Sequence, residues 1–212
     1  DLFLQLSACG NLLVAVPSTA AQYYHLLRTQ AHASRGVPLI VMTPKSLLRA
    51  EAAKSRAEEF TGTFRPVLPD PAPPQRATRV LLCTGKVAYD LLDHRRKQAD
   101  VGSAIVRIER VYPFPAEELA AVLRTFPDAR ELRWVQEEPA NMGAWRNTRH
   151  RLDGVLPEGA TLSLVARKAA STPASGFYAL HVEQERQLIE RAFREGGPGA
   201  APRPARRGAA RA

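Results

Sequence analysis

At the centre of the chain stands Arg79-Val80-Leu81-Leu82-Cys83-Thr84-Gly85-Lys86, a mainly apolar run followed by a Thr-Gly-Lys turn. An apolar run of this length that ends in a turn is typical of a strand buried on both faces. The residues that follow, 86–98, space their apolar side chains as a helix does. The stretch therefore predicts a strand, a tight turn and a helix, which is the repeating unit of parallel α/β folds.

The same alternation continues towards the carboxyl terminus. It predicts, in chain order, a strand at 104–111, a helix at 115–125, a strand at 132–136, a helix at 141–152, a strand at 161–165 and a helix at 178–195. Strictly alternating strands and helices favour an α/β domain with a parallel-type sheet and helices on both faces. We expect residues 77–195 to form that domain.

Residues 1–45 predict the last strands and helices of a second α/β domain. Two apolar runs, 12–16 and 38–43, flank a helical segment at 20–34, and Ser18 or Thr19 is the expected N-cap. Residues 46–76 contain a short helical pattern at 51–59 and then four prolines within six residues, so we expect an interdomain linker. Residues 196–212 are rich in Gly, Ala, Pro and Arg and predict a disordered basic tail.

Composition narrows the class of protein. With 212 residues and 45% hydrophobic content, the chain can bury an ordinary core. No apolar run approaches the length of about 18 residues that a membrane span needs. Cys9 and Cys83 both stand among apolar residues, so we expect two buried thiols and a reducing compartment such as the cytoplasm. The formal charge of +9 raises nucleic-acid binding as a hypothesis, but four of the excess charges fall in the tail, and we do not favour it.

Two turns after predicted strands carry candidate binding residues. Thr84 and Lys86 open a helix at the carboxyl end of a strand, where α/β sheets place ligands, so they are candidate anion contacts. A tight turn with an exposed lysine is the competing interpretation, because the spaced glycine of a phosphate-binding loop is absent. Glu137, Glu138 and Asn141 follow another strand. Adjacent residues on a strand point to opposite sides, so the two glutamates favour an interface role over a shared-proton dyad.

Lys45 and Arg49 follow the strand at 38–43 and are candidate contacts at the domain junction or with a ligand there. The five histidines show no metal-ligand spacing with one another or with the cysteines. The sequence contains neither a nucleophile elbow nor a dinucleotide fingerprint. It therefore predicts no catalytic, cofactor-binding or metal-binding residue of its own.

Three ordered blocks resemble one enzyme family. They are AQYYHLLR at residues 21–28, PLIVMTPKSLLR at 38–49 and WVQEEPANMGAW at 134–145. All three resemble the thiamine diphosphate-dependent decarboxylating component of the 2-oxoglutarate dehydrogenase complex. The resemblance covers residues 1 to about 195. It implies a carboxyl-terminal fragment: the end of the pyrimidine-binding domain, then the transketolase-type C-terminal domain.

The resemblance implies an activity for the whole enzyme. That enzyme uses thiamine diphosphate and Mg²⁺ to decarboxylate 2-oxoglutarate in the tricarboxylic acid cycle, and it passes the succinyl group to a lipoyl domain of the dihydrolipoyl succinyltransferase component. A homodimer is implied, with catalytic residues expected upstream of Asp1 and no cofactor bound by this part alone. Two alternatives stay open: a relative that acts on 2-oxoadipate, and a non-catalytic interaction module of the same fold.

Overall fold

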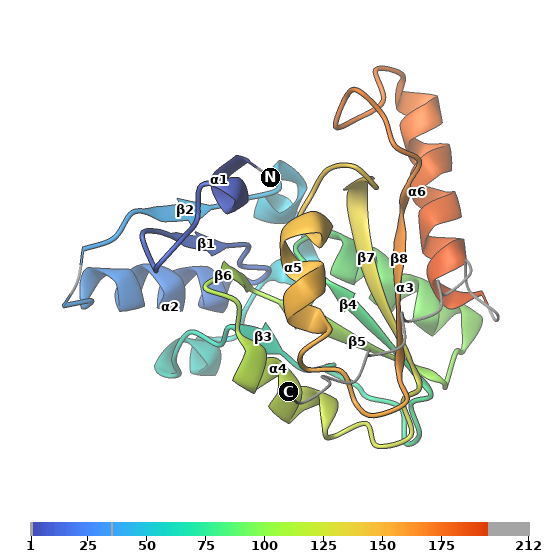
Figure 1. Ribbon diagram of the computed structural model, residues 1–212, viewed down its shortest axis with the longest axis horizontal. Helices are drawn as coiled ribbons and strands as arrows, with labels where there is room; N and C mark the ends of the chain where they lie inside the picture. The colour runs from blue at the N-terminus through green and yellow to red at the C-terminus, as the bar shows by residue number, and fades with distance from the viewer. Residues whose placement is uncertain (1, 35, 195–212) are drawn as a thin grey trace, which may run out of the picture.

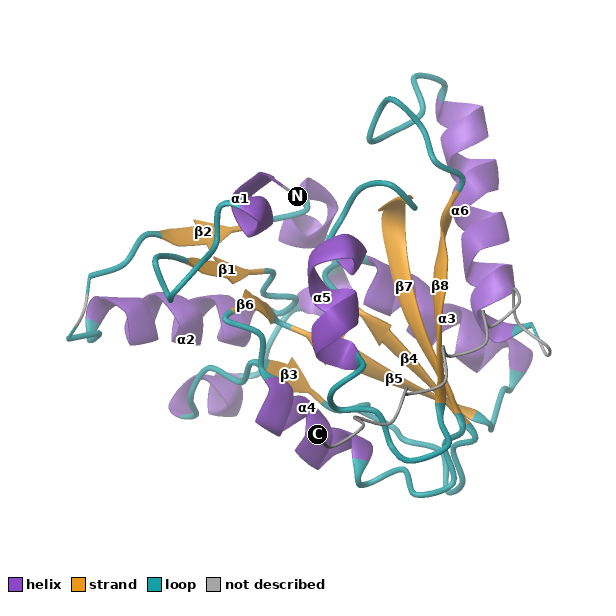
Figure 2. Cartoon of the chain, viewed as in Figure 1, coloured by secondary structure: helices purple, strands orange, loops and turns teal. Residues whose placement is uncertain are grey.

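The computed structural model describes residues 2–34 and 36–194, which form two sheets surrounded by helices (Figures 1 and 2). The larger sheet has five strands in the order β3-β5-β4-β7-β8. Their bounds are Val67–Leu68 (β3), Ser103–Ile108 (β5), Arg79–Cys83 (β4), Glu131–Pro139 (β7) and Thr161–Arg167 (β8). The last four strands are parallel, which confirms the predicted α/β class.

Helices cover both faces of this sheet, as predicted. On one face, Val80 and Leu82 of β4 pack in a cluster with residues of α4 (Ala116–Leu123) and α5 (Trp145–Leu152). On the other face, Leu81 and Cys83 pack with α3 (Val87–Gln98) and α6 (Tyr178–Phe193). The two clusters alternate along β4 because successive strand residues point to opposite faces. Arg133 and Arg79 then hold the end of α6, since their guanidinium groups donate to its last carbonyl oxygens.

The expected strand at 104–111 is wrong as a single element. It divides at Glu109 into β5 and a separate strand β6, Arg110–Tyr112. Strand β6 leaves the larger sheet and pairs antiparallel with β1 (Leu13–Ala15), whose other neighbour is the parallel strand β2 (Leu39–Val41). The larger sheet is parallel except at one edge, where β3 pairs antiparallel with β5. The small sheet is completed by a strand from the second half of the chain.

The amino-terminal part otherwise follows the prediction. Helix α1 covers Leu2–Gln5 and helix α2 covers Ala20–Ala31. Of the two expected N-caps, Thr19 is the one that serves, because its hydroxyl accepts from the Gln22 amide at 3.1 Å.

The two cysteines differ in burial. Cys83 is buried as expected, and burial raises the pKa of its thiol to about 12. Cys9 is exposed, so the prediction of a buried thiol there is wrong.

The segment between the two sheets is fastened at one buried ion pair. The expected helix at 51–59 is replaced by 3₁₀ turns, η2 (Glu51–Ala53) and η3 (Ala57–Thr61), after η1 (Lys45–Arg49). The Asp70 side chain is fully buried, and its carboxylate accepts from both terminal nitrogens of Arg95 and from the Ile105 amide. The proline-rich stretch is thereby held against β5.

Two ends of the chain carry predictions that the structure does not test. Asp1, upstream of which the resemblance places the catalytic residues, lies outside the described residues. The predicted basic tail at 196–212 lies outside them as well. Both therefore stay predictions from the sequence.

Candidate functional site at the carboxyl ends of the strands

Four of the seven candidate residues meet at one groove. Thr84 and Lys86 follow β4, while Glu137 and Glu138 lie near the end of its neighbour β7. All four line a groove of about 380 Å³ between the two sheets. The parallel pairing of β4 and β7 brings their carboxyl ends to the same edge, which is where ligands bind in open α/β sheets.

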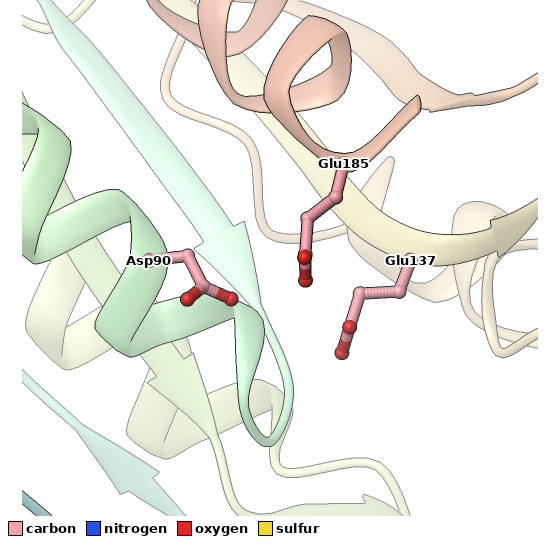
Figure 3. Close-up of side chains that lie close together, drawn as sticks. All are labelled: Asp90, Glu137 and Glu185. Atoms are coloured by element: carbon pink, nitrogen blue, oxygen red, sulfur yellow. The ribbon is translucent and has the colours of Figure 1, made fainter. Parts of the chain in front are cut away.

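Three carboxylates from three elements, those of Asp90, Glu137 and Glu185, lie close together (Figure 3). The ammonium of Lys86 lies among them. Its ammonium is 2.7 Å from Asp90 of α3 and 3.2 Å from Glu137 of β7, and it also contacts Glu185 of α6. The lysine side chain is 22% exposed, so the expectation of an exposed lysine is wrong. The contacts join α3, β7 and α6. They also neutralise the positive charge of Lys86, which the sequence had indicated as an anion contact.

Burial and charge change the proton affinities of this cluster. Burial raises the pKa of the Asp90 and Glu137 carboxyls, and the nearby lysine only partly opposes this effect. Burial also disfavours the charged form of Lys86, but hydrogen bonds from its ammonium to Asp90 and Glu185 outweigh it and raise the pKa of the lysine. Lys86 therefore stays protonated at any physiological pH and cannot act as a base.

Oxygen atoms of Asp90, Glu137 and Glu185 lie within 4.8 Å of one another, close enough to hold a metal ion. The ammonium of Lys86 already lies among them, however, and a fixed positive charge repels a divalent cation. The three carboxylates are balanced by a lysine, so their arrangement does not fit a Mg²⁺ site.

The two adjacent glutamates have separate environments, as alternation along a strand requires. Glu137 turns to Lys86, whereas Glu138 is exposed. The turn after them is shaped by Gln136, a buried residue that the sequence analysis missed. Its side chain accepts from the Trp134 indole and the Trp145 amide and donates to the Met142 carbonyl oxygen. The side-chain amide of Gln136 thus holds the turn in one conformation through these hydrogen bonds.

Gly143 is required in this turn. It has a φ of +75°, and a Cβ atom there would lie 2.8 Å from both polar atoms of the Gln136 amide. Asn141, in the same turn, does not face the groove. Its amide forms a two-way bridge to Ala170, donating at 2.9 Å and accepting at 3.0 Å, so it ties the turn to the segment after β8.

Lys45 and Arg49 lie apart from this cluster, at the two ends of η1, and both are exposed. Arg49 borders a second groove of about 400 Å³, together with Tyr23, Leu47 and Leu48. The junction between the two sheets is held by other residues. The sequence therefore predicted a junction near these residues but not the contacts that make it.

The junction is built around the buried carboxylate of Glu109, which is 0% exposed. Ser18 donates to it twice, from its amide at 2.7 Å and from its hydroxyl at 2.5 Å, and Arg107 donates to the same hydroxyl at 3.0 Å. The Tyr89 hydroxyl donates to the Ser18 carbonyl oxygen. Burial raises the pKa of Glu109 despite these donors. A glutamate inside an apolar strand pattern was the available signal for this network.

Comparison with known proteins agrees with this architecture. A solved structure described as a split-gene transketolase in an inactive β4 tetramer has a TM-score of 0.58 and 14% sequence identity, and the match covers 86% of this chain and 58% of that one. At this identity the likeness shows the fold alone, which is of the transketolase type. No helix in the described ranges is long and apolar enough to cross a bilayer.

Family models and relatives narrow the class further. Residues 54–193 match the 2-oxoglutarate dehydrogenase C-terminal family, and residues 3–51 match the transketolase pyrimidine-binding domain family. The chain belongs to the 2-oxoglutarate dehydrogenase C-terminal family. It is 44% identical over 199 residues to the 2-oxoglutarate dehydrogenase E1 component of Azotobacter vinelandii and 43% identical over 196 residues to that of Haemophilus influenzae. Each match covers 91% of this chain and 21% of the relative.

Proposed function

We propose that the protein is part of a thiamine diphosphate-dependent 2-oxo acid dehydrogenase that decarboxylates 2-oxoglutarate and passes the succinyl group to lipoamide in the tricarboxylic acid cycle. One observation carries the proposal. Residues 3–51 and 54–193 match, in consecutive order, a cofactor-domain family and a family specific to 2-oxoglutarate dehydrogenase. Relatives named for that enzyme align with 91% of the chain.

Within such an enzyme, we assign the described residues a supporting role. The Glu109 network and the shared small sheet fix the pyrimidine-domain part against the C-terminal domain. Because both parts are held by buried contacts, their relative position is defined. Four of the candidate contacts line the groove between the two sheets: Thr84, Lys86, Glu137 and Glu138. Lys45 and Arg49 are exposed on η1, and Asn141 ties the turn after β7 to the segment after β8.

Thiamine diphosphate and Mg²⁺ would bind to other residues of the whole enzyme, and the catalytic residues are expected upstream of Asp1. The cluster of Asp90, Glu137 and Glu185 does not fit the metal, because Lys86 lies within it. The cofactor supplies the decarboxylation chemistry when bound. The proposed domain boundaries are 1–45, 46–76, 77–195 and 196–212.

The partners follow from the same proposal. We expect a homodimer that works with the lipoyl-bearing dihydrolipoyl succinyltransferase component and a small 2-oxo acid, without membrane or nucleic-acid binding. A reducing compartment, the cytoplasm of a bacterium, fits the two free thiols.

The test begins with the native polypeptide purified from its source. Its intact mass is measured first, and ferricyanide reduction is then followed with thiamine diphosphate, Mg²⁺ and either 2-oxoglutarate or 2-oxoadipate. We expect a mass several times 23.3 kDa and a higher kcat/KM for 2-oxoglutarate. A preference for 2-oxoadipate would change the substrate, and a mass near 23.3 kDa with no turnover would favour an interaction module.

A further inference from the structure

Helix α6 begins beyond the edge of the larger sheet at which the parallel strands end (Figure 1). Strand β8 ends there at Arg167, and the chain turns back to start α6 at Tyr178. The buried residues of α6, Leu188, Ile189 and Ala192, all lie in its second half, whereas residues 178–187 contain none. Since helices in proteins depend mainly on the packing of an apolar face, the first half of α6 lacks, among the described residues, the contacts that usually stabilise a helix.

The start of α6 also presents the main exposed apolar surface of residues 54–193. These residues have five exposed large hydrophobic side chains, and four of them lie here: Phe177, Tyr178, Leu180 and Val182. Phe177 is 78% exposed and Tyr178 is 81% exposed. These four side chains, the α6 patch, together expose roughly 500 Å². Apolar patches of this size on a protein surface are often binding sites.

The charges around the α6 patch are already paired. All three glutamates of the helix form ion pairs: Glu183 and Glu190 with Arg186, and Glu185 with Lys86. No carboxylate of α6 is therefore left to select a basic partner. A surface that covers the patch is selected by apolar contact and by shape.

A recess that suits such a projection lies on the same side of the molecule. It is the groove of about 380 Å³ between the two sheets, at the carboxyl ends of β4 and β7. Half-buried apolar side chains line it, among them Leu4, Val16 and Met42. Lys86 lines the same groove and contacts Glu185 of α6, so the groove lies beside the projecting half of the helix. One surface thus presents both an apolar projection and a largely apolar recess.

We propose that two copies of this chain pair across this surface, with the α6 patch of each copy entering the groove of the other. A two-fold axis midway between patch and groove exchanges the two features, so both contacts form at once. Burying two patches and the groove walls around them covers roughly 1,500 Å² in total, within the range of a stable interface. Phe177 and Tyr178 are the aromatic anchors. The contact specifies the homodimer of the proposed function and rests on that proposal.

Cross-linking between copies tests the contact in the protein at its native length. Tyr178→Cys places a thiol on the α6 patch, and Thr43→Cys places one on the exposed rim of the groove. Both are made in a Cys9→Ser background, which removes the exposed native thiol. With a short bismaleimide, we expect a covalent dimer from the double variant and from neither single variant. A cross-link within one chain, a dimer from either single variant, or no cross-link would overturn the proposal.

A matched pair of substitutions locates the anchor. Phe177 and Val101 are both 78% exposed, but Val101 precedes β5 and lies at the opposite edge of the larger sheet. In the double-cysteine variant, Phe177→Asp should slow formation of the covalent dimer about tenfold, because it removes an apolar anchor. Val101→Asp should leave the rate unchanged, and equal rates in the two variants would refute the contact.

The readout is a covalent dimer and not turnover, so the two proposals fail separately. An active dehydrogenase without the cross-link would refute only this contact. An inactive protein that forms the cross-link would refute only the proposed activity.

Discussion

Two regions of the molecule differ in how completely they bury their own apolar side chains. The first region, residues 2–51, has two strands of three residues each, whereas the second region, residues 54–193, has strands of up to nine residues in its larger sheet. The first region is a quarter of the described chain but has seven of its twelve exposed large hydrophobic side chains: Leu2, Phe3, Leu6, Tyr23, Tyr24, Leu27 and Leu48.

The difference means that the first region depends on the second. It takes its third strand, β6, from the second region, and its β1–α2 turn is held by the carboxylate of Glu109. The second region has its own clusters on both faces of the five-stranded sheet. We therefore expect damage to the second region to unfold both parts, and damage to the first region to stay local.

The largest effect should come from Asp70, which fastens the proline-rich stretch of the second region to Arg95 of α3 and to β5. Asp70→Ala leaves the Arg95 guanidinium buried without its counter-ion and should lower the free energy of unfolding by about 4 kcal/mol. Urea denaturation monitored by circular dichroism measures it. Asp128→Ala breaks the exposed Arg76–Asp128 pair instead and should cost less than about 1 kcal/mol. Similar losses of unfolding free energy in Asp70→Ala and Asp128→Ala would contradict the inference that the buried ion pair stabilises the protein more than the exposed one.

Matched leucine truncations compare the regions directly. Leu82 is 0% exposed in the cluster shared with α4 and α5, and Leu82→Ala should cost about 3 kcal/mol. Leu26, on α2, is 4% exposed but lies outside the clusters on both faces of the larger sheet, so its surroundings can relax and Leu26→Ala should cost about 2 kcal/mol. The same denaturation curves give both values. A larger loss of unfolding free energy for Leu26→Ala than for Leu82→Ala would contradict the inference that the first region is less well packed than the second.

The contact between the regions should respond to pH. The pKa of Glu109 is raised by burial in the folded protein, so its ionisation favours the unfolded chain. Its stabilising contribution is complete below the ordinary glutamate pKa of about 4.3 and is lost as pH rises through the raised pKa. The difference in unfolding free energy between Glu109→Gln and the unmodified protein should therefore shift in favour of the variant as pH rises.

Urea denaturation of both proteins at several pH values measures this difference in unfolding free energy. Taking the difference cancels the pH dependence that comes from titrating groups present in both proteins. Asp90 and Glu137, whose pKa values are also raised, act in the same direction in both proteins, and Glu131, whose pKa is lowered, acts in the opposite direction. Tyr89→Phe, which removes only a neutral donor to Ser18, is the control and should shift stability equally at every pH. A constant difference for Glu109→Gln would show that this carboxyl does not titrate differently in the two states.

The sequence predicted what depends on local pattern and missed what depends on distant contacts. Strand β4 was predicted with its observed bounds, because five residues between two turns define it. The break at Glu109 was missed because the partners of its main chain and carboxylate, Val16, Ser18 and Pro66, come from other parts of the chain. The same holds for Lys86. The sequence shows a lysine after a turn, but the carboxylate of Glu185 that neutralises it comes from a helix near the end of the described chain.

The smallest effect tests whether the first region opens by itself. Thr19→Ala removes the hydroxyl that accepts from the Gln22 amide and should cost α2 about 1 kcal/mol. Thr29→Ala, at an exposed position of the same helix, is the control and should change stability by only a few tenths of a kcal/mol. Amide hydrogen exchange should show faster exchange in α2 of Thr19→Ala with unchanged protection of β4 and β5. If β4 and β5 lose protection to the same extent, the two regions unfold as one unit, and the dependence is mutual.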